Sequence, residues 1–227
     1  MKKSKTYLTY WGKYTPFVDT FPIKYLLFIY LIGFLLPYIV FGDKTLLRFW
    51  AGKESLAEFI QFFEFFISSI LCFLIYLKNK DNITKKEKLA WILVSTTLLF
   101  ISFEEISLLD LINDGIPSLR DLNIQGESNI HNLKILSSII QPIYILFNLI
   151  LGYLGQKIWP NNNILPSPFY SLYFLFPALF YTAFLFSQNP NVMTLPYHHE
   201  IFEFLTATGI FLHCLKKYRK KNNKIKC

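Results

Sequence analysis

The chain has 227 residues, of which 53% are hydrophobic and 19% aromatic, with 23 Lys and Arg against 15 Asp and Glu. Several apolar runs approach the length that crosses a bilayer, about 20 residues, and they exclude an ordinary soluble domain. The net charge of +8 does not indicate nucleic acid, because the Lys and Arg residues flank the apolar runs. We therefore expect an all-α, polytopic helical membrane bundle that forms a single domain over residues 1–227.

Six apolar segments are near the length of a membrane-spanning helix. They cover residues 23–41, 56–77, 89–109, 133–154, 169–186 and 198–215. Pro142 and Pro177 interrupt the fourth and fifth segments, which membrane helices tolerate. The sequence thus predicts about six transmembrane helices.

Basic residues predict the orientation of these helices. Lys and Arg concentrate in the arm 1–22, in the loop 78–88 and in the tail 216–227, and they are sparse in the alternate loops. Loops rich in Lys and Arg remain on the cytoplasmic side. We therefore expect a multi-pass protein of the cell inner (plasma) membrane with both termini in the cytoplasm. The basic tail is either a stop-transfer signal, which we favour, or a contact for anionic lipid headgroups.

Carboxylates gather where three of the predicted spans reach the outer face. Glu58 lies near the outer end of the second span, Glu104 and Glu105 near that of the third, and Glu200 and Glu203 near that of the sixth. Ionisable groups at membrane depth are costly, so they are functional candidates by default. The sequence predicts that these side chains share one polar site.

Each carboxylate also has a structural interpretation. Ser55 and Glu58 have the spacing of a capping box, and Glu200 lies in a first helical turn, where the helix dipole favours an acid. Glu104 and Glu105 approach a helix C-terminus, where the dipole disfavours negative charge, so they require a cation, a shared proton or a strong donor. The alternative for this pair is exposure at the outer interface.

A further pair, Glu127 and His131, has the spacing of two ligands on one helical face. Such a pair binds a metal ion or lets an acid orient an imidazole, although the commoner case is a dipole partner and a solvated histidine. Carboxylate-bridged di-metal sites in four-helix proteins use Glu-x-x-His, whereas three residues separate the pair here. The predicted metal ligands are Glu104, Glu105, Glu127, His131, Glu200 and Glu203.

Oxygen-rich ligands suit iron, manganese, magnesium or calcium better than structural zinc. His199 and Glu58 are the predicted acid/base groups, because an imidazole titrates near neutrality. The segment from His199 to Glu203 does not match the helical zinc-protease motif, since Glu203 stands where the second histidine belongs. Glu64 lies deeper, where it pairs with Gln61 or is buried as the neutral acid.

The strings Phe103-Glu-Glu-Ile-Ser107 and Asn123-Ile-Gln-Gly-Glu-Ser-Asn-Ile-His-Asn132, with Glu54-x-x-x-Glu58 and Glu200-x-x-Glu203, carry a resemblance. They resemble a family of uncharacterised bacterial multi-pass membrane proteins with a Glu-Glu-Ile-Ser signature followed by Asn-x-Gln-Gly-Glu-x-Asn-x-His-Asn. In that family Trp-Gly-Gln follows the first string, where this chain has residues 108–110 as Leu-Leu-Asp. The resemblance groups the acidic residues and implies no particular reaction.

Three functions fit these observations. The first is a metal-dependent membrane enzyme that acts on a lipid or an amphiphile at the outer leaflet. The second is a proton- or cation-coupled transporter or ion sensor, which requires a polar path through the bundle. The third is a membrane scaffold or assembly factor whose polar patch binds a partner protein. We favour the first function, that of a metal-dependent membrane enzyme. We expect the protein to lie in the lipid bilayer and not to bind nucleic acid.

Overall fold

The computed structural model describes residues 7–9, 12–14, 55–107, 117–122, 133–159, 162, 164–186 and 196–222, and the statements below concern these residues. The predicted span 23–41, Glu127, His131 and the side chain of His199 lie outside them. Helices dominate the described chain, which confirms the predicted all-α class. A short antiparallel pair of strands, β1 (Tyr7–Thr9) and β2 (Gly12–Tyr14), lies within the predicted N-terminal arm.

The first two long helices, α3 (Leu56–Asn79) and α4 (Lys85–Glu105), form a helical hairpin, and each begins with a capping box. Two serines hold the hairpin together: Ser69 Oγ donates to the Ser95 carbonyl at 2.8 Å, and Ser95 Oγ donates to the Ser69 carbonyl at 2.9 Å. Small hydroxyl side chains let helix backbones approach closely and bond across the contact.

The second pair of long helices is α7 (Lys134–Leu149) and α9 (Ser171–Phe186). The π-helical turn η3 (Ile150–Leu154) and α8 (Gly155–Ile158) extend α7. The 3-10 turn η4 (Pro168–Tyr170) leads into α9. A separate short helix, α6 (Pro117–Leu122), lies beyond α4 in the chain.

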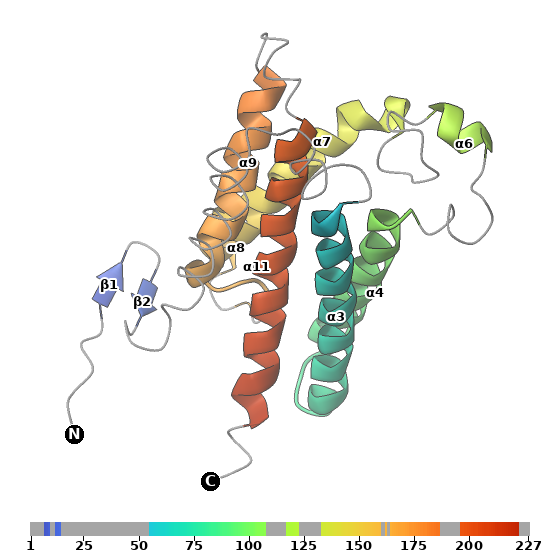
Figure 1. Cartoon of the computed structure of the whole chain (residues 1–227). Helices are drawn as coiled ribbons and strands as arrows, with labels where there is room; N and C mark the ends of the chain where they lie inside the picture. The colour runs from blue at the N-terminus through green and yellow to red at the C-terminus, as the bar shows by residue number, and fades with distance from the viewer. Residues whose placement is uncertain are drawn as a thin grey trace.

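The last helix, α11 (Pro196–Asn222), lies between the two pairs and contacts both α3 and α9 (Figure 1). It runs parallel to α3, because Gln61 bonds to Glu200 near the start of both helices and Cys72 meets Cys214 further along. Its direction is opposite to that of α9, since Tyr170 bonds to the carbonyl of Leu212 and Tyr181, nearer the end of α9, bonds to Glu203, nearer the start of α11. The described helices therefore alternate in direction as the sequence predicts.

The contact between α9 and α11 depends on a glycine. A Cβ atom on Gly209 would lie 2.7 Å from the Cβ of Tyr173 and 2.9 Å from a ring carbon of Phe174. Both aromatic side chains are buried, at 1% and 0% exposure. The absence of a side chain at Gly209 lets α11 lie directly against α9.

Two helical stretches in the described chain, Leu56–Asn79 and Ile139–Ile158, are long and apolar enough to cross a membrane. They coincide with the second and fourth predicted spans. The helices α4, α9 and α11 lie where the third, fifth and sixth spans are predicted, and their crossing of a membrane stays a prediction. The α9 helix has 16 residues, fewer than the roughly 20 that cover the hydrocarbon thickness.

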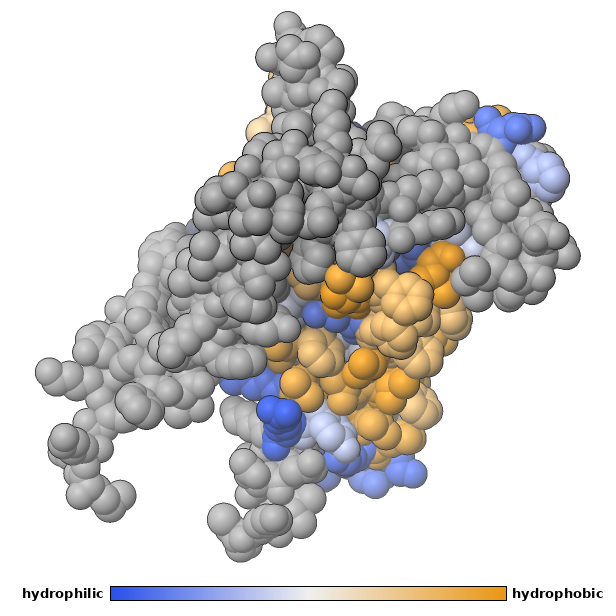
Figure 2. Space-filling view, in the orientation of Figure 1, coloured by the Kyte–Doolittle hydropathy of each residue, from blue (hydrophilic) through white to orange (hydrophobic). Residues whose placement is uncertain are grey.

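The α3 helix places its polar residues inside and its apolar residues outside. Gln61, Glu64 and Ser68 are buried toward the bundle. Apolar side chains with 41–57% exposure line the opposite face, which contributes to the hydrophobic surface in Figure 2: Phe59, Phe63, Ile67, Ile70, Phe73 and Leu77. A soluble helix has the reverse distribution. This distribution agrees with the finding that α3 is long and apolar enough to cross a membrane.

Candidate carboxylate site

Four of the predicted site residues come together where α3 and α11 begin and α4 ends. We call this the acidic end; it comprises Glu58 of α3, Glu105 of α4, and Glu200 and Glu203 of α11. The carboxylates of Glu203, Glu58 and Glu105, in decreasing order, act electrostatically on that of Glu200. The antiparallel hairpin and the parallel α3–α11 contact bring these distant residues to one end of the bundle (Figure 1).

Burial of Glu200 comes first in this arrangement, and repulsion from the other carboxylates adds to it. Carboxylates that interact at short range cannot all be ionised unless a cation, a proton or strong donors compensate them. Glu200 is only partly exposed at the head of α11, so water screens it incompletely. The acidic end therefore has the electrostatic character of a site that attracts positive charge.

Glu58 has a structural role in addition to its place in this group. Its Oε2 accepts the backbone N–H of Ser55 at 3.1 Å, and the Ser55 hydroxyl accepts the backbone N–H of Glu58 at 3.3 Å. These two bonds form the capping box that the sequence offered as the alternative interpretation, and the structure confirms it. One carboxylate oxygen of Glu58 therefore already accepts a hydrogen bond at the start of α3.

Glu104 and Glu105 close α4, at the end where the helix dipole is negative. The helix stops because Ser107 adopts φ 44°, in the left-handed region, while its N–H bonds to the carbonyl of Glu104 at 3.2 Å. This turn ends α4 directly after Glu105, whose carboxylate belongs to the acidic end. Glu105 also acts electrostatically on the phenol of Tyr144 in α7.

Glu203 has a specific partner, since the hydroxyl of Tyr181 in α9 donates a hydrogen bond to its Oε1. The ring of Tyr181 packs against that of Tyr144, with centroids 4.7 Å apart. The Tyr144 hydroxyl lies 2.7 Å from Thr206 Oγ1, and Thr206 donates to Asn148 Oδ1 at 2.9 Å. Two sets of hydrogen bonds and the ring contact between the tyrosines thus form a network that joins α7, α9 and α11 beside the acidic end.

Gln61 connects α3 to α11 beneath the carboxylates. Its Nε2 donates to the backbone carbonyl of Glu200 at 3.0 Å, and its side chain is fully buried. Its Oε1 is buried, and no residue in the described part of the chain donates a hydrogen bond to it. A buried carbonyl oxygen without a donor costs free energy, roughly 1–3 kcal/mol, and it is an acceptor available to a cation or a proton.

The predicted metal site is only partly covered by the structure. Among the residues described, no three His, Cys, Asp or Glu side chains approach closely enough to hold a metal ion. Glu127 and His131, two of the six predicted ligands, lie outside the described residues, and so does the side chain of His199. The metal site therefore stays a prediction.

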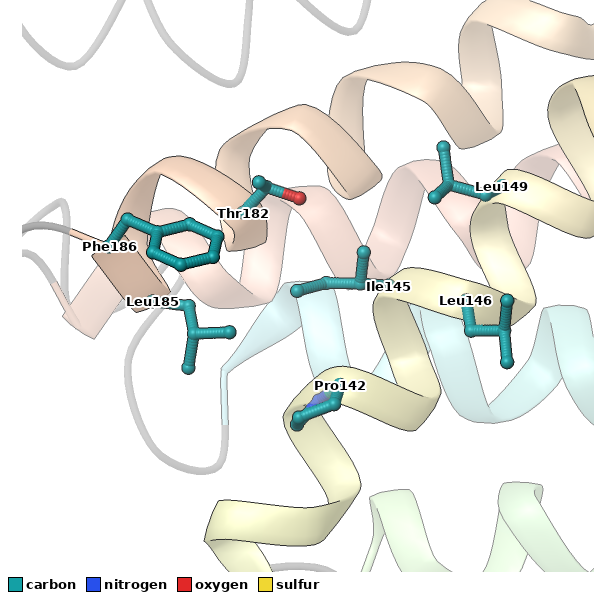
Figure 3. A pocket seen from close by; sticks show the side chains of 7 residues that line it. All are labelled: Pro142, Ile145, Leu146, Leu149, Thr182, Leu185 and Phe186. Carbon is teal, nitrogen blue, oxygen red and sulfur yellow. The ribbon is translucent and has the colours of Figure 1, made fainter.

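An open apolar cleft of about 320 Å³ lies between α7 and α9 (Figure 3). Its lining is almost entirely hydrocarbon, from Pro142, Ile145, Leu146, Leu149, Thr182, Leu185 and Phe186. Tyr144 and Tyr181, which belong to the network above, directly precede Ile145 and Thr182 in the chain. The cleft therefore lies on the same two helices, α7 and α9, as the tyrosines beside the acidic end.

Sequence reasoning did not find Tyr144 and Tyr181, and it treated Gln61 only as a partner for Glu64. The tyrosines are two of fourteen, and both lie in apolar runs without a distinguishing neighbour. Gln61 carried a usable signal, because it lies three residues from both Glu58 and Glu64 and so shares their helical face.

Comparisons of this chain with models of known protein families, with curated proteins and with solved structures give no match. The family resemblance drawn from the acidic motifs stays a prediction.

Proposed function

We propose that the protein is a multi-pass protein of the plasma membrane with six spans and with the acidic end at the outer face. Two helical stretches have the length and hydropathy of membrane spans, and the described long helices alternate in direction. The basic residues Lys78, Lys85, Lys216 and Lys217 lie at the end of the bundle opposite to the acidic end. That distribution supports cytoplasmic termini.

We further propose that the acidic end binds a divalent metal ion. The observation that carries this proposal is the electrostatic action of three carboxylates, from three helices, on the largely buried carboxylate of Glu200. A bound cation would relieve this repulsion, and oxygen ligands favour iron, manganese, magnesium or calcium. Glu104, Glu127 and His131 are the further predicted ligands, and the buried Oε1 of Gln61 is a further oxygen at this end.

The chemistry that we propose is metal-dependent conversion of a lipid or another amphiphile. The apolar cleft between α7 and α9 offers room for part of an acyl chain beside the tyrosine network. A bound metal ion would supply Lewis acidity. Of the two predicted acid/base groups, Glu58 already accepts the N–H of Ser55, so we assign that role to His199.

Metal analysis of the purified full-length protein tests the site. We expect about one metal ion or more per chain, with a loss of metal in Glu105→Gln and Glu200→Gln. Asp81→Asn is the matched control, because it makes the same change of charge in the exposed loop at the opposite end and is expected to retain the metal. Protein that holds no metal, with all three variants equal, would refute the proposed centre.

A second candidate function is proton- or cation-coupled transport, which one further observation favours. Glu64 is buried between α3 and α11, where Thr208 Oγ1 lies 3.0 and 2.8 Å from its two carboxylate oxygens. Ionisable groups inside a membrane bundle often mark ion pathways. Flux in proteoliposomes that is lost in Glu64→Gln, with the metal content unchanged, would favour transport over catalysis.

A further inference from the structure

Glu64 lies eight residues after the start of α3, about 12 Å along the helix axis from the first turn. Its side chain is 9% exposed, and its neighbours in the α3–α11 contact include the buried residues Phe65, Ser68 and Thr208. The Thr208 hydroxyl is within hydrogen-bond distance of both carboxylate oxygens, at 3.0 and 2.8 Å. A hydroxyl has one hydrogen, so it satisfies one of these two acceptors at a time.

The donors and acceptors in this contact do not balance. The Ser68 hydroxyl already donates a hydrogen bond to the backbone carbonyl of Glu64, at 2.5 Å. Gln61 Nε2 already donates to the backbone carbonyl of Glu200, while Gln61 Oε1 receives no hydrogen bond from the described residues. Among the described side chains, Thr208 is thus the one donor to the two carboxylate oxygens of Glu64. The same buried interface also contains the amide oxygen of Gln61, which is unpaired among the described residues. Among the side chains that the structure describes, this interface therefore has fewer donors than acceptors.

The charged and titratable groups that the structure describes on α3, α4 and α11 do not supply the missing donor. Toward the acidic end these groups are carboxylates, Glu58 on α3, Glu105 on α4 and Glu200 on α11. Toward the other end of the α3–α11 contact are the two thiols of Cys72 and Cys214. The Lys and Arg side chains described on α3, α4 and α11 lie at the end of the bundle opposite to the acidic end. The two main influences on the Glu64 carboxyl group are its burial, which is the larger, and its hydrogen bond with Thr208.

We propose that Glu64 is a proton-binding site inside the bundle, where a bound proton supplies the donor that the described side chains of the α3–α11 interface lack. A proton is the ligand with the right chemistry, because Na⁺ or a divalent ion needs more oxygen ligands than Glu64 and Thr208 provide. The charged form of a carboxylate is costly in such an apolar site. This proposal does not depend on a metal ion at the acidic end.

Labelling with a hydrophobic carbodiimide tests the proposal in the full-length protein in membranes. A protonated carboxyl group adds across one C=N bond of the reagent to give an O-acylisourea. This rearranges by an oxygen-to-nitrogen acyl shift to a stable N-acylurea, which peptide mass spectrometry locates. We expect the α3 peptide to be labelled at Glu64, with a rate that falls as the pH rises. Glu64→Gln should abolish this label, and Glu87, a partly exposed capping carboxylate of α4, should remain unlabelled.

Two results would overturn the proposal. The first is a Glu64 that stays unmodified in the folded protein although the same reagent labels it in detergent-unfolded chain. The second is protection of Glu64 by added Na⁺ at constant pH, which would show that a metal cation occupies the site.

An infrared difference spectrum recorded on a pH change provides a second measurement that does not depend on access of the reagent. It should contain the carbonyl band of a protonated carboxyl group, and Glu64→Gln should remove that band. The absence of this band in the unsubstituted protein would also contradict the proposal. The metal content of Glu64→Gln separates the two proposals, since it should equal that of the unsubstituted protein if the acidic end binds metal on its own.

Discussion

The hydroxyl of Tyr181 on α9 donates a hydrogen bond to the carboxylate of Glu203 on α11. Glu203 is also the group that acts most strongly on Glu200 among the carboxylates of the acidic end. The bond therefore does two things: it ties α9 to α11, and it compensates one of several negative charges that crowd together. A hydrogen bond to a charged group contributes more than a neutral one, about 1.5–3 kcal/mol.

This bond predicts a measurable coupling between the two side chains. Tyr181→Phe should lower the free energy of unfolding by about 1–3 kcal/mol, because it leaves a carboxylate without its donor. The double variant with Glu203→Gln should lose less than the sum of the single losses. Unfolding titrated with a denaturing detergent measures all three variants. Tyr76→Phe, on the partly exposed side of α3, is the control and should change little; additive effects of the two substitutions would contradict the contact.

Gly209 leads to a second prediction, which concerns the packing of α9 on α11. Gly209→Ala should reduce the free energy of unfolding by about 1–3 kcal/mol, because its Cβ would lie 2.7 Å from that of Tyr173. The gain in helix propensity from Gly to Ala, about 1 kcal/mol, acts in the opposite direction and should not offset the overlap. Thermal unfolding of the solubilised protein checks it. The control is Leu179→Ala, since Leu179 is 63% exposed; a Gly209→Ala protein as stable as the original would mean that the helices lie further apart.

The positions and directions of the described helices were predictable because they depend on local patterns. The length of an apolar run and the placement of Lys and Arg beside it are properties of contiguous sequence, and α3 and α4 match the second and third predicted segments. Pro177 weakened the prediction of the fifth segment, yet α9 continues through it. The π-helical turn η3 was not predicted, since nothing in residues 150–154 distinguishes it from an α-helical turn.

The candidate site was predictable in its location and less so in its partners. The convergence of Glu58, Glu105 and Glu200 followed from the predicted directions of three helices. The contact between Tyr181 and Glu203 depends on how α9 is rotated about its axis relative to α11, and a run that is apolar all round contains no signal for that rotation. Glu58 was ambiguous because its capping box and its place at the acidic end are compatible, and the structure shows both.

A third prediction concerns the end of α4. Ser107 adopts φ 44°, a conformation that costs an L-residue about 1–2 kcal/mol and costs glycine almost nothing. Ser107→Gly should therefore be tolerated or stabilising, whereas the β-branched Ser107→Val should be less stable than the glycine variant by about 1–2 kcal/mol. Thermal unfolding of the two variants side by side gives the difference. Equal stabilities would mean that α4 does not end in a left-handed turn.

The parallel alignment of α3 and α11 is the basis of both the carboxylate site and the proton site, and it leads to a fourth prediction. The free thiols of Cys72 and Cys214 are buried in this contact, with their sulfur atoms 3.4 Å apart. A two-electron oxidant, such as a copper–phenanthroline complex with oxygen, should join them in a disulfide and release two protons. The small separation of the sulfur atoms makes this bond accessible with a modest shift of the side chains.

Counting thiols in the unfolded protein measures the reaction. The chain has three cysteines, so three groups should be alkylated before oxidation and one, Cys227, afterwards. Cys72→Ser and Cys214→Ser are matched controls, and each should retain both of its remaining thiols in monomeric chain. If the unsubstituted protein keeps three thiols under oxidant that reaches the membrane interior, or if Cys227 pairs instead, then α3 and α11 are not aligned as the bonds of Gln61 and Glu64 to α11 require.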